Sequence, residues 1–237
     1  MRSMGWEHPT TNFPDREIIR AILGTCRFGA RIRYSQQRSK PTIYPNLAIA
    51  DADITLMSAD ISSELEKDRL DTYSDINTIP PLYTASPVGL VDKADGSKRR
   101  IHHLSYLPDD PMAINKGIPE EFGSIIYSGI VDAVSAIQIL GKDCILIKRD
   151  FESAFRHIPV SPYDSPLCGF HWQNQYYAER YLPFGLWTAP YLFDLLAEDF
   201  HWILEDQLIK HHIPARIIHY LDDFHIVIPA SEKPRSL

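Results

Sequence analysis

The spacing of apolar residues along the chain predicts four helices. They cover the segments 14–24, 50–70, 129–140 and 187–209. In each segment apolar side chains return every three to four residues, which is the period of one buried helix face. Pro14 is a start signal and Gly24 a stop signal for the first helix. The last segment predicts a long amphipathic helix.

A hairpin is predicted within residues 79–107. The apolar run VGLV and the later run RRIHHLSYL flank the pair Asp95-Gly96, which favours a tight turn. The residues just after this turn are SKRR, so the hairpin has a basic tip. We therefore expect two antiparallel strands that carry cations at one end.

Three further segments predict strands. CILI (144–147) opens a strong strand, and residues 167–181 predict a hairpin that turns at 173–175. Residues 213–229, IPARIIHYLDDFHIVIP, predict two short strands with two aspartates between them. A helix-rich start followed by interleaved helices and hairpins predicts an α+β fold with a mainly antiparallel sheet packed on helices.

Length and composition fit an ordinary globular protein. The chain has 237 residues, of which 44% are hydrophobic, enough for one large domain or two small ones. It contains no run of about 18 apolar residues, and its first residues lack the apolar block of a secretory signal. Three cysteines form an odd count without the spacing of a zinc site. We therefore expect an intracellular protein, in cytoplasm or nucleus, with no membrane segment.

Charge is distributed unevenly along the chain. The net charge is −7, which argues mildly against a nucleic-acid binder. Residues 1–40, however, hold eight Lys or Arg against three Asp or Glu, while residues 111–237 hold ten against sixteen. The basic stretch RFGARIRYSQQRSK could bind phosphates, or it could be a solvated surface.

Two adjacent aspartates, Asp222 and Asp223, interrupt an apolar and aromatic run near the end of the chain. Burying carboxylates among such residues is costly unless a cation, a strong partner or solvent takes up the charge. A magnesium site is one explanation, because Mg²⁺ prefers carboxylate and phosphate oxygens. Side chains alternate along a strand, so both aspartates can face one site only if a turn lies at LDDF.

A third carboxylate would have to come from elsewhere, and Asp150 is the best candidate. It ends the predicted strand ILIKRD, and the hairpin and long helix between it and Asp222 could bring the two strands together. Catalysis of phosphoryl transfer by two metal ions needs such a shared set of carboxylates. The alternative for Asp150 is a helix N-cap, since SAF follows it closely.

Four motifs in order make the chain similar to the reverse transcriptases of retroelements. These are DGSKRRIHHLSYL (95–107), DFESAF (150–155), LPFGLWTAPYLF (182–193) and YLDD (220–223). The resemblance covers about residues 80 to 230 and is greatest to the DIRS-like and Ty3-like retrotransposons of fungi. It implies the fingers and palm of a right-hand polymerase. The implied activity is RNA-directed DNA synthesis on an RNA or DNA template with primer, using deoxynucleoside triphosphates.

By this resemblance, Asp150 and Asp222 hold two magnesium (or manganese) ions, and Asp223 contributes more weakly. The main-chain carbonyl of Phe151 is the expected additional ligand. The ions would activate the primer 3′-hydroxyl and neutralise charge on the transferring phosphate. Glu152 is expected to face away from the metal ions.

The same resemblance assigns residues to the nucleotide. Phe155 would be an aromatic gate that excludes a ribose 2′-hydroxyl, although it could also be a core residue. Lys98 and Arg100 would grip the triphosphate, because ammonium and guanidinium groups pair with phosphate oxygens. A solvated hairpin is the alternative for these cations. Phe184 stands where many retroviral enzymes carry glutamine, a departure that marks lineage.

Three residues are assigned to the template and primer. Pro183 and Gly185 would lie over the nascent base pair, and Gly185 would permit close approach of the backbone to nucleic acid. Tyr220 would pack near the primer end, with a core tyrosine as the alternative. The histidines form no recognisable ligand motif in the sequence and are given no chemistry.

The expected organisation has three parts. Residues 1–78 form a helical and basic N-terminal extension, 79–149 the fingers with the basic hairpin, and 150–237 a truncated palm core. The thumb is expected to be absent, because the chain stops shortly after YLDD. Without a thumb the chain should hold primer–template poorly. A catalytically inactive remnant that binds nucleic acid or a partner is therefore the alternative to an active polymerase.

Overall fold

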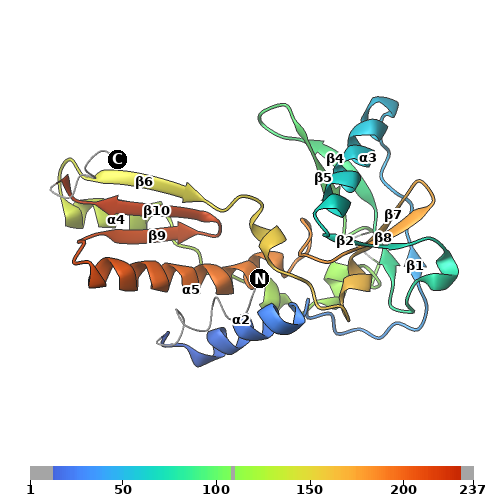
Figure 1. The fold of residues 1–237 in the computed structure, drawn as a ribbon, viewed down its shortest axis with the longest axis horizontal. Helices are drawn as coiled ribbons and strands as arrows, with labels where there is room; N and C mark the ends of the chain where they lie inside the picture. The colour runs from blue at the N-terminus through green and yellow to red at the C-terminus, as the bar shows by residue number, and fades with distance from the viewer. Residues whose placement is uncertain (1–12, 108–109, 231–237) are drawn as a thin grey trace. The chain divides into compact units, whose positions relative to one another are not determined.

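A computed structural model describes residues 13–107 and 110–230, which form two compact units (Figure 1). The first unit consists of Thr25–Gly123 and Phe155–Ala189. The described part of the second unit consists of 13–24, Ser124–Ala154 and 190–230. These units cross the boundaries expected from the sequence, because strand pairing joins segments that lie far apart along the chain.

The first unit is built on a five-stranded sheet with the order β1-β3-β7-β8-β2. Its strands are β1 (Thr42–Ile43), β2 (Leu70–Tyr73), β3 (Thr84–Ala85), β7 (Gly169–Trp172) and β8 (Gln175–Glu179). The predicted hairpin at 167–181 is confirmed as β7 and β8, which pair antiparallel. The parallel pairs β1–β3 and β3–β7 were not expected, because residues 42–43 and 84–85 are too short to give a strand pattern.

A helix and a hairpin complete the first unit. Helix α3 (Asp51–Glu66) and the hairpin of β4 (Val88–Asp92) and β5 (Lys98–His102) confirm two predicted elements. The core between them and the sheet contains Met57, Ile61, Leu70, Val88, Phe170 and Tyr177. Burial of these apolar side chains stabilises the unit.

The second unit has a fully antiparallel sheet with the order β6-β10-β9 (Figure 1). Its elements are β6 (Ile145–Asp150), β9 (Arg216–Tyr220), β10 (Asp223–Ile228), α4 (Ile130–Leu140) and α5 (Ala189–Lys210). Ile218 and Val227 share one face of the sheet and pack against Ala136 of α4. Phe224 points to the other face and contacts Phe200 of α5. The two helices therefore cover opposite faces, as alternation along a strand requires.

Helix α2 (Arg16–Phe28) corrects one sequence prediction. Its first turn is capped by Asp15, whose carboxylate accepts backbone hydrogen bonds at 2.8 and 3.2 Å. Gly24 does not stop the helix. The stop is Gly29, which has a φ of +77° and leaves no room for a Cβ beside the backbone of Ser161.

Short 3₁₀ segments connect the main elements. They are Ile76–Thr78, Ile114–Gly117, Glu120–Gly123, Ala154–His157 and Ser165–Cys168. Among the described residues, no helix has the length and apolar character needed to cross a bilayer.

Candidate active site

Three aspartates meet at one end of the sheet in the second unit. Asp223, the first residue of β10, is the cross-strand partner of Asp150, the last residue of β6. The N–H of Phe151 donates a hydrogen bond of 3.1 Å to the carbonyl oxygen of Asp222. The strand pairing therefore brings Asp150 next to both members of the aspartate pair, as the sequence predicted.

The turn between β9 and β10 places the two neighbouring aspartates. Tyr220 and Asp223 are paired across the hairpin, so Leu221 and Asp222 form a two-residue turn. Leu221 has a φ of +52°, a conformation in which turns of this kind usually carry glycine. A side chain held there costs on the order of 1–3 kcal/mol and is found most often at functional sites.

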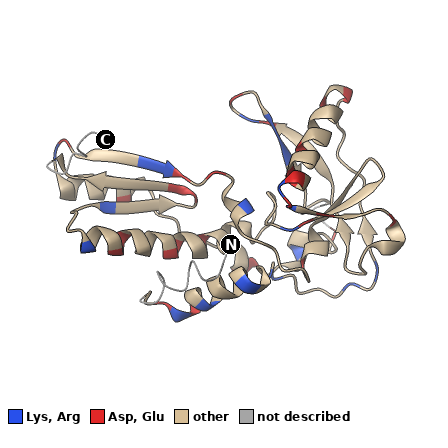
Figure 2. Cartoon of the chain, viewed as in Figure 1, with Lys and Arg blue, Asp and Glu red and all other residues tan. Residues whose placement is uncertain are grey.

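Like charges dominate the electrostatics of this aspartate cluster, which we define as Asp150, Asp222 and Asp223. Burial, and then the charges of Asp150 and Asp223, raise the pKa of Asp222 above its ordinary value. Lys148 Nζ lies 2.8 Å from Asp223 Oδ1, and this hydrogen bond raises the pKa of Lys148. Figure 2 shows acidic residues where β6 and β10 meet, directly after basic residues of β6.

The side chains of the aspartate cluster are of the type that a hard divalent cation binds, but their carboxylate oxygens do not all lie within 4.8 Å of one another. Carboxylate oxygens are the ligands that Mg²⁺ prefers. Asp150 is exposed and the other two are half-buried, so solvent and ligands can reach them. In the described part of the chain Lys148 is the residue that pairs with these carboxylates. One ammonium group does not balance three carboxylates, so a bound cation would lower the remaining repulsion.

Phe151 anchors the cluster to the helix below it. Its ring contacts Phe193, Phe200 and Phe224, with centroid distances of 5.8, 5.1 and 5.7 Å. Aromatic packing of this kind fixes the end of β6 against α5. The role of the Phe151 carbonyl as a metal ligand stays a prediction.

Tyr220 is exposed rather than part of the core. Half of its surface is accessible, and its ring packs against Tyr127 with a centroid distance of 4.5 Å. Tyr220 ends β9 next to the turn that carries Asp222, and Tyr127, which precedes α4, packs against it. The contact of Tyr220 with a primer stays a prediction.

In the first unit, two of the residues assigned to the nucleotide lie together. The rings of Phe155 and Phe184 are 5.3 Å apart and both are half-buried. The guanidinium of Arg99 lies 5.5 Å from the centroid of the Phe184 ring. Phe155, Phe184 and Arg99, which we call the aromatic platform, thus combine apolar rings with an exposed cation.

Arg100 does not lie where the sequence placed it. Its side chain is 5% exposed and pairs with Asp60 at 2.7 Å and Glu179 at 2.8 Å. The cause is strand alternation: Arg100 turns into the unit, and its neighbour Arg99 turns outward. The period of two along β5 could have identified Arg99, which the sequence analysis missed. The buried pairing counts against a triphosphate role for Arg100.

Lys98 is accessible but already paired. Its ammonium lies 2.9 Å from Asp53 Oδ2 and 3.3 Å from Asp92 Oδ1. The hydrogen bonds to Asp53 and Asp92 raise its pKa. Its triphosphate role stays a prediction, and a phosphate would have to replace these carboxylates.

The loop after Pro183 is shaped for close approach. Gly185 is exposed, has a φ of +101°, and a Cβ there would lie 2.2 Å from the carbonyl oxygen of His102. Asn115 holds the loop from both sides: it donates to the Gly185 carbonyl at 2.8 Å and accepts from the Trp187 N–H at 2.9 Å. The positions of Pro183, which is buried, and Gly185 are therefore tightly fixed. Nothing in the sequence pattern pointed to Asn115.

The family model described as reverse transcriptase (RNA-dependent DNA polymerase) matches residues 93–236, more than half of the chain. The chain belongs to this family. A search of curated proteins found no match.

Solved structures of prototype foamy virus protease–reverse transcriptase share the fold. The CSH mutant is 20% identical with a TM-score of 0.56, and the alignment covers 87% of this chain and 24% of that chain. A foamy viral protease–reverse transcriptase dRH in complex with ds DNA is 17% identical with a TM-score of 0.60. That alignment covers 96% of this chain and 38% of the other. This chain thus spans well under half the length of either protein.

Proposed function

We propose that this chain is the fingers-and-palm portion of an RNA-directed DNA polymerase that adds deoxynucleotides to a primer 3′-hydroxyl with two divalent cations. The observation that carries the proposal is the strand register that sets Asp150 opposite Asp223 and beside Asp222. The family and the fold support the same reaction. If the three aspartates served only the fold, gathering like charges at a strained, half-exposed turn would not stabilise it.

Within the proposal, Asp150 and Asp222 are the main ligands of the cations, with the Phe151 carbonyl as an additional one. Bound Mg²⁺ or Mn²⁺ would activate the primer 3′-hydroxyl and neutralise the negative charge of the transferring phosphate. Asp223 has an indirect role, because Lys148 already engages its Oδ1 at 2.8 Å. Lys148 then limits the repulsion within the cluster before substrate arrives.

The aromatic platform is proposed to contact the incoming nucleotide. Phe155 would lie beneath the sugar, where its ring leaves no space for a ribose 2′-hydroxyl. Arg99 is better suited than Arg100 to contact phosphates, because its guanidinium is exposed and lies over Phe184. Lys98 would contribute by exchanging its carboxylate partners for phosphate.

The template and primer are proposed to contact two further places. Gly185, with Pro183 before it, is exposed and held in place by Asn115, and it offers its backbone to the template and primer. Tyr220, half-exposed beside Tyr127, offers a ring on which the primer end could stack. Such stacking tolerates any base and therefore suits a polymerase.

Primer extension tests the proposal. An RNA template, a DNA primer, deoxynucleotides and Mg²⁺ are incubated with the wild-type chain, Asp222→Asn and Asp206→Asn. Asp206 is the matched control, because it is half-buried like Asp222 but lies on α5, where Lys210 pairs with it at 2.5 Å. We expect Asp222→Asn to lower incorporation by at least about 10²–10³-fold and Asp206→Asn to leave it unchanged. Equal incorporation by wild type and Asp222→Asn would exclude the aspartate cluster as the catalytic centre.

We also propose that the chain derives from a retrotransposon of the DIRS-like or Ty3-like kind found in fungi. The support is the sequence LPFG, in which phenylalanine stands at position 184. The neighbouring reading frame in the source genome tests this origin. Coding sequence for a thumb, ribonuclease H and an element-specific recombinase or integrase is expected there, and host coding sequence on both sides would contradict it.

A further inference from the structure

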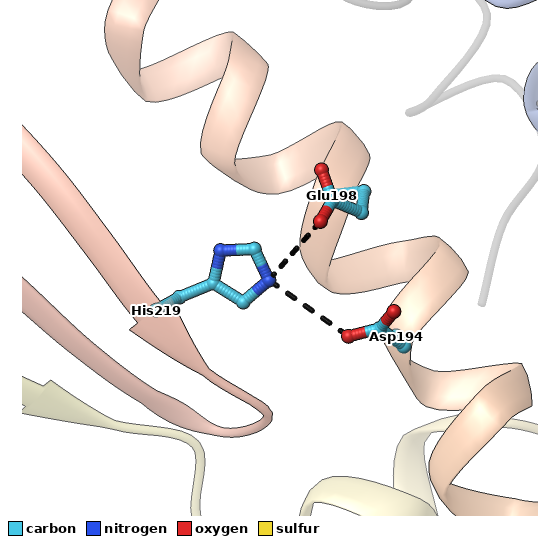
Figure 3. Close-up of side chains that lie close together, drawn as sticks. All are labelled: Asp194, Glu198 and His219. Carbon is cyan, nitrogen blue, oxygen red and sulfur yellow. Dashed lines mark ion pairs between the residues drawn. The ribbon is translucent and has the colours of Figure 1, made fainter. Parts of the chain in front are cut away.

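A second group of ligand-type side chains lies between α5 and β9 (Figure 3). Asp194 and Glu198 are one helical turn apart on α5, and both point toward His219 of β9. His219 Nε2 lies 3.9 Å from Asp194 Oδ1 and 3.6 Å from Glu198 Oε1. The three ligand atoms all lie within 4.8 Å of one another, and among the residues described the structure contains no other such His, Cys, Asp or Glu set.

These distances are too long for hydrogen bonds and close to those between two ligands of one metal ion. A nitrogen–oxygen hydrogen bond spans about 2.7–3.2 Å. Two ligands of a tetrahedral zinc ion, each bound at about 2.0–2.1 Å, lie about 3.3 Å apart. A contraction of a few tenths of an ångström would therefore bring His219 and Glu198 to coordination distance.

The imidazole of His219 is held by its other nitrogen. Its Nδ1 lies 2.8 Å from Nδ1 of His201, and Nε2 of His201 lies 3.4 Å from Glu205 Oε1. The contact at Nδ1 leaves Nε2 of His219 directed at the two carboxylates of α5.

A cation held between Nε2 of His219 and the two carboxylates would balance their negative charge. His201 contacts the other ring nitrogen of His219, and a partner at the second nitrogen is typical of metal-binding histidines. The ring of His219 is further fixed by stacking on Phe224, with centroids 5.0 Å apart. His219 is only 6% exposed, so this arrangement is built into the packing of the unit.

We propose that Asp194, Glu198 and His219 bind a divalent transition-metal ion such as Zn²⁺, which links α5 to the strand before the catalytic turn. One imidazole with two carboxylates suits zinc better than magnesium, which prefers an all-oxygen set. A hollow of about 250 Å³, lined in part by Glu198, His201 and Glu205, gives solvent a route to this edge of the helix.

The zinc site is distinct from the aspartate cluster. His219 shares its face of the sheet with Phe224, which packs on α5, whereas Asp150, Asp223 and Tyr220 lie on the opposite face. The two sites should therefore bind metal independently. The zinc site would fix β9, and with it Tyr220, against the long helix.

Calorimetric titration with Zn²⁺ and visible spectroscopy with Co²⁺ test the proposal. The background is the Asp150→Asn, Asp222→Asn chain, from which the two main ligands of the aspartate cluster are removed. We expect one Zn²⁺ per chain in this background and a cobalt spectrum typical of mixed nitrogen and oxygen ligands. Glu198→Gln, at a half-exposed position, should abolish both signals, and His201→Gln should weaken binding about 10–100-fold.

His225→Gln is the matched control, because His225 lies on the same hairpin but on the opposite face. It should leave Zn²⁺ binding unchanged. His219→Gln should abolish binding, and the exposed Glu198 variant decides the matter if that chain fails to fold. Zn²⁺ binding that survives Glu198→Gln, or that is already lost in the background chain, would overturn the proposal. Neither result depends on polymerase activity.

Discussion

In the first unit Glu179 is fully buried between Arg100 and Arg156, whereas in the second unit Asp222 lies half-buried beside Asp150 and Asp223. Burial alone would raise the pKa of Glu179, but Arg156 and Arg100 overcome it and lower the pKa to about 2. Burial and like charges raise the pKa of Asp222. The same functional group is therefore neutralised by the fold in one place and left with excess charge in the other.

The comparison distinguishes a carboxylate that stabilises the fold from carboxylates that can bind a ligand. A carboxylate whose charge is already balanced by cationic side chains of the protein has no free charge with which to bind a ligand. A carboxylate surrounded by others of its kind needs an external cation, and it must stay accessible to receive one. Glu179 is accordingly 0% exposed, while the aspartate cluster stays in contact with solvent.

The largest effect on stability is expected from Glu179→Gln. This change leaves Arg156 and Arg100 buried with fewer acceptors, although Glu64 and Asp60 remain near them. The free energy of unfolding should fall by about 3–5 kcal/mol, measured by urea denaturation. Glu66→Gln, at the exposed end of α3, is the control and should change it by less than about 0.5 kcal/mol. Equal effects of the two changes would show that the buried pairs contribute nothing.

Lowering the pH should lower the stability of the first unit and raise that of the second. Glu179 has its pKa lowered from 4.5 to about 2, so its contribution to stability is complete above about pH 4.5 and is lost as the pH falls toward 2. His102 is buried, which lowers its pKa from 6.5 to about 4, and stability should fall as the pH drops through that interval. The protection factors of the amides in β8, which are corrected for the pH dependence of intrinsic exchange, should therefore fall on acidification, and Glu179→Gln should remove the step below pH 4.5.

Asp199 in the second unit provides the opposite case. It is fully buried on α5, and among the residues described both of its carboxylate oxygens lack a partner. Burial raises its pKa from 3.8 to about 6. The folded state thus binds a proton more tightly than the unfolded state, so ionisation costs stability as the pH rises through that interval.

Asp199→Asn should consequently stabilise the second unit at pH 7.5 by about 1–3 kcal/mol. The gain should disappear below about pH 4, where the wild-type carboxyl is already neutral. Amide exchange in α5 at both pH values measures this change. A loss of stability at pH 7.5 would show that the charge of Asp199 has a partner after all.

The sequence was sufficient for the aspartate cluster but not for the ion pairs. The cluster could be predicted because its residues lie at the ends of strands with clear patterns, and alternation required the turn at LDDF. The pairing of Arg100 with Glu179 could not, since the two residues lie 79 positions apart and only the packed sheet brings them together. His219 was set aside for the same reason, because its partners Asp194 and Glu198 belong to another element.

The end of helix α2 also depends on a contact that the local sequence does not contain. Gly24 has the residue type of a stop signal, yet the helix continues through it to Phe28. The actual stop, Gly29, is selected by contact with the backbone of Ser161, a long-range feature that local spacing does not contain. Local patterns thus identified the helices, and tertiary contacts decided where this one ends.

The smallest effect, and the one that tests the comparison most directly, is that of Asp222→Asn on stability. Removing one of three like charges should leave the free energy of unfolding unchanged or raise it by up to about 1 kcal/mol, opposite in sign to Glu179→Gln.

Millimolar Mg²⁺ should stabilise the wild-type chain, because a ligand that binds only the folded state shifts the equilibrium toward it. The same Mg²⁺ should stabilise Asp222→Asn less, while Glu179→Gln should keep the full increment. Urea denaturation with and without Mg²⁺ measures all three chains, and an equal Mg²⁺ effect in wild type and Asp222→Asn would show that the cluster is not the cation site. A destabilised Asp222→Asn would instead mean that the protein already compensates this charge, as it does for Glu179.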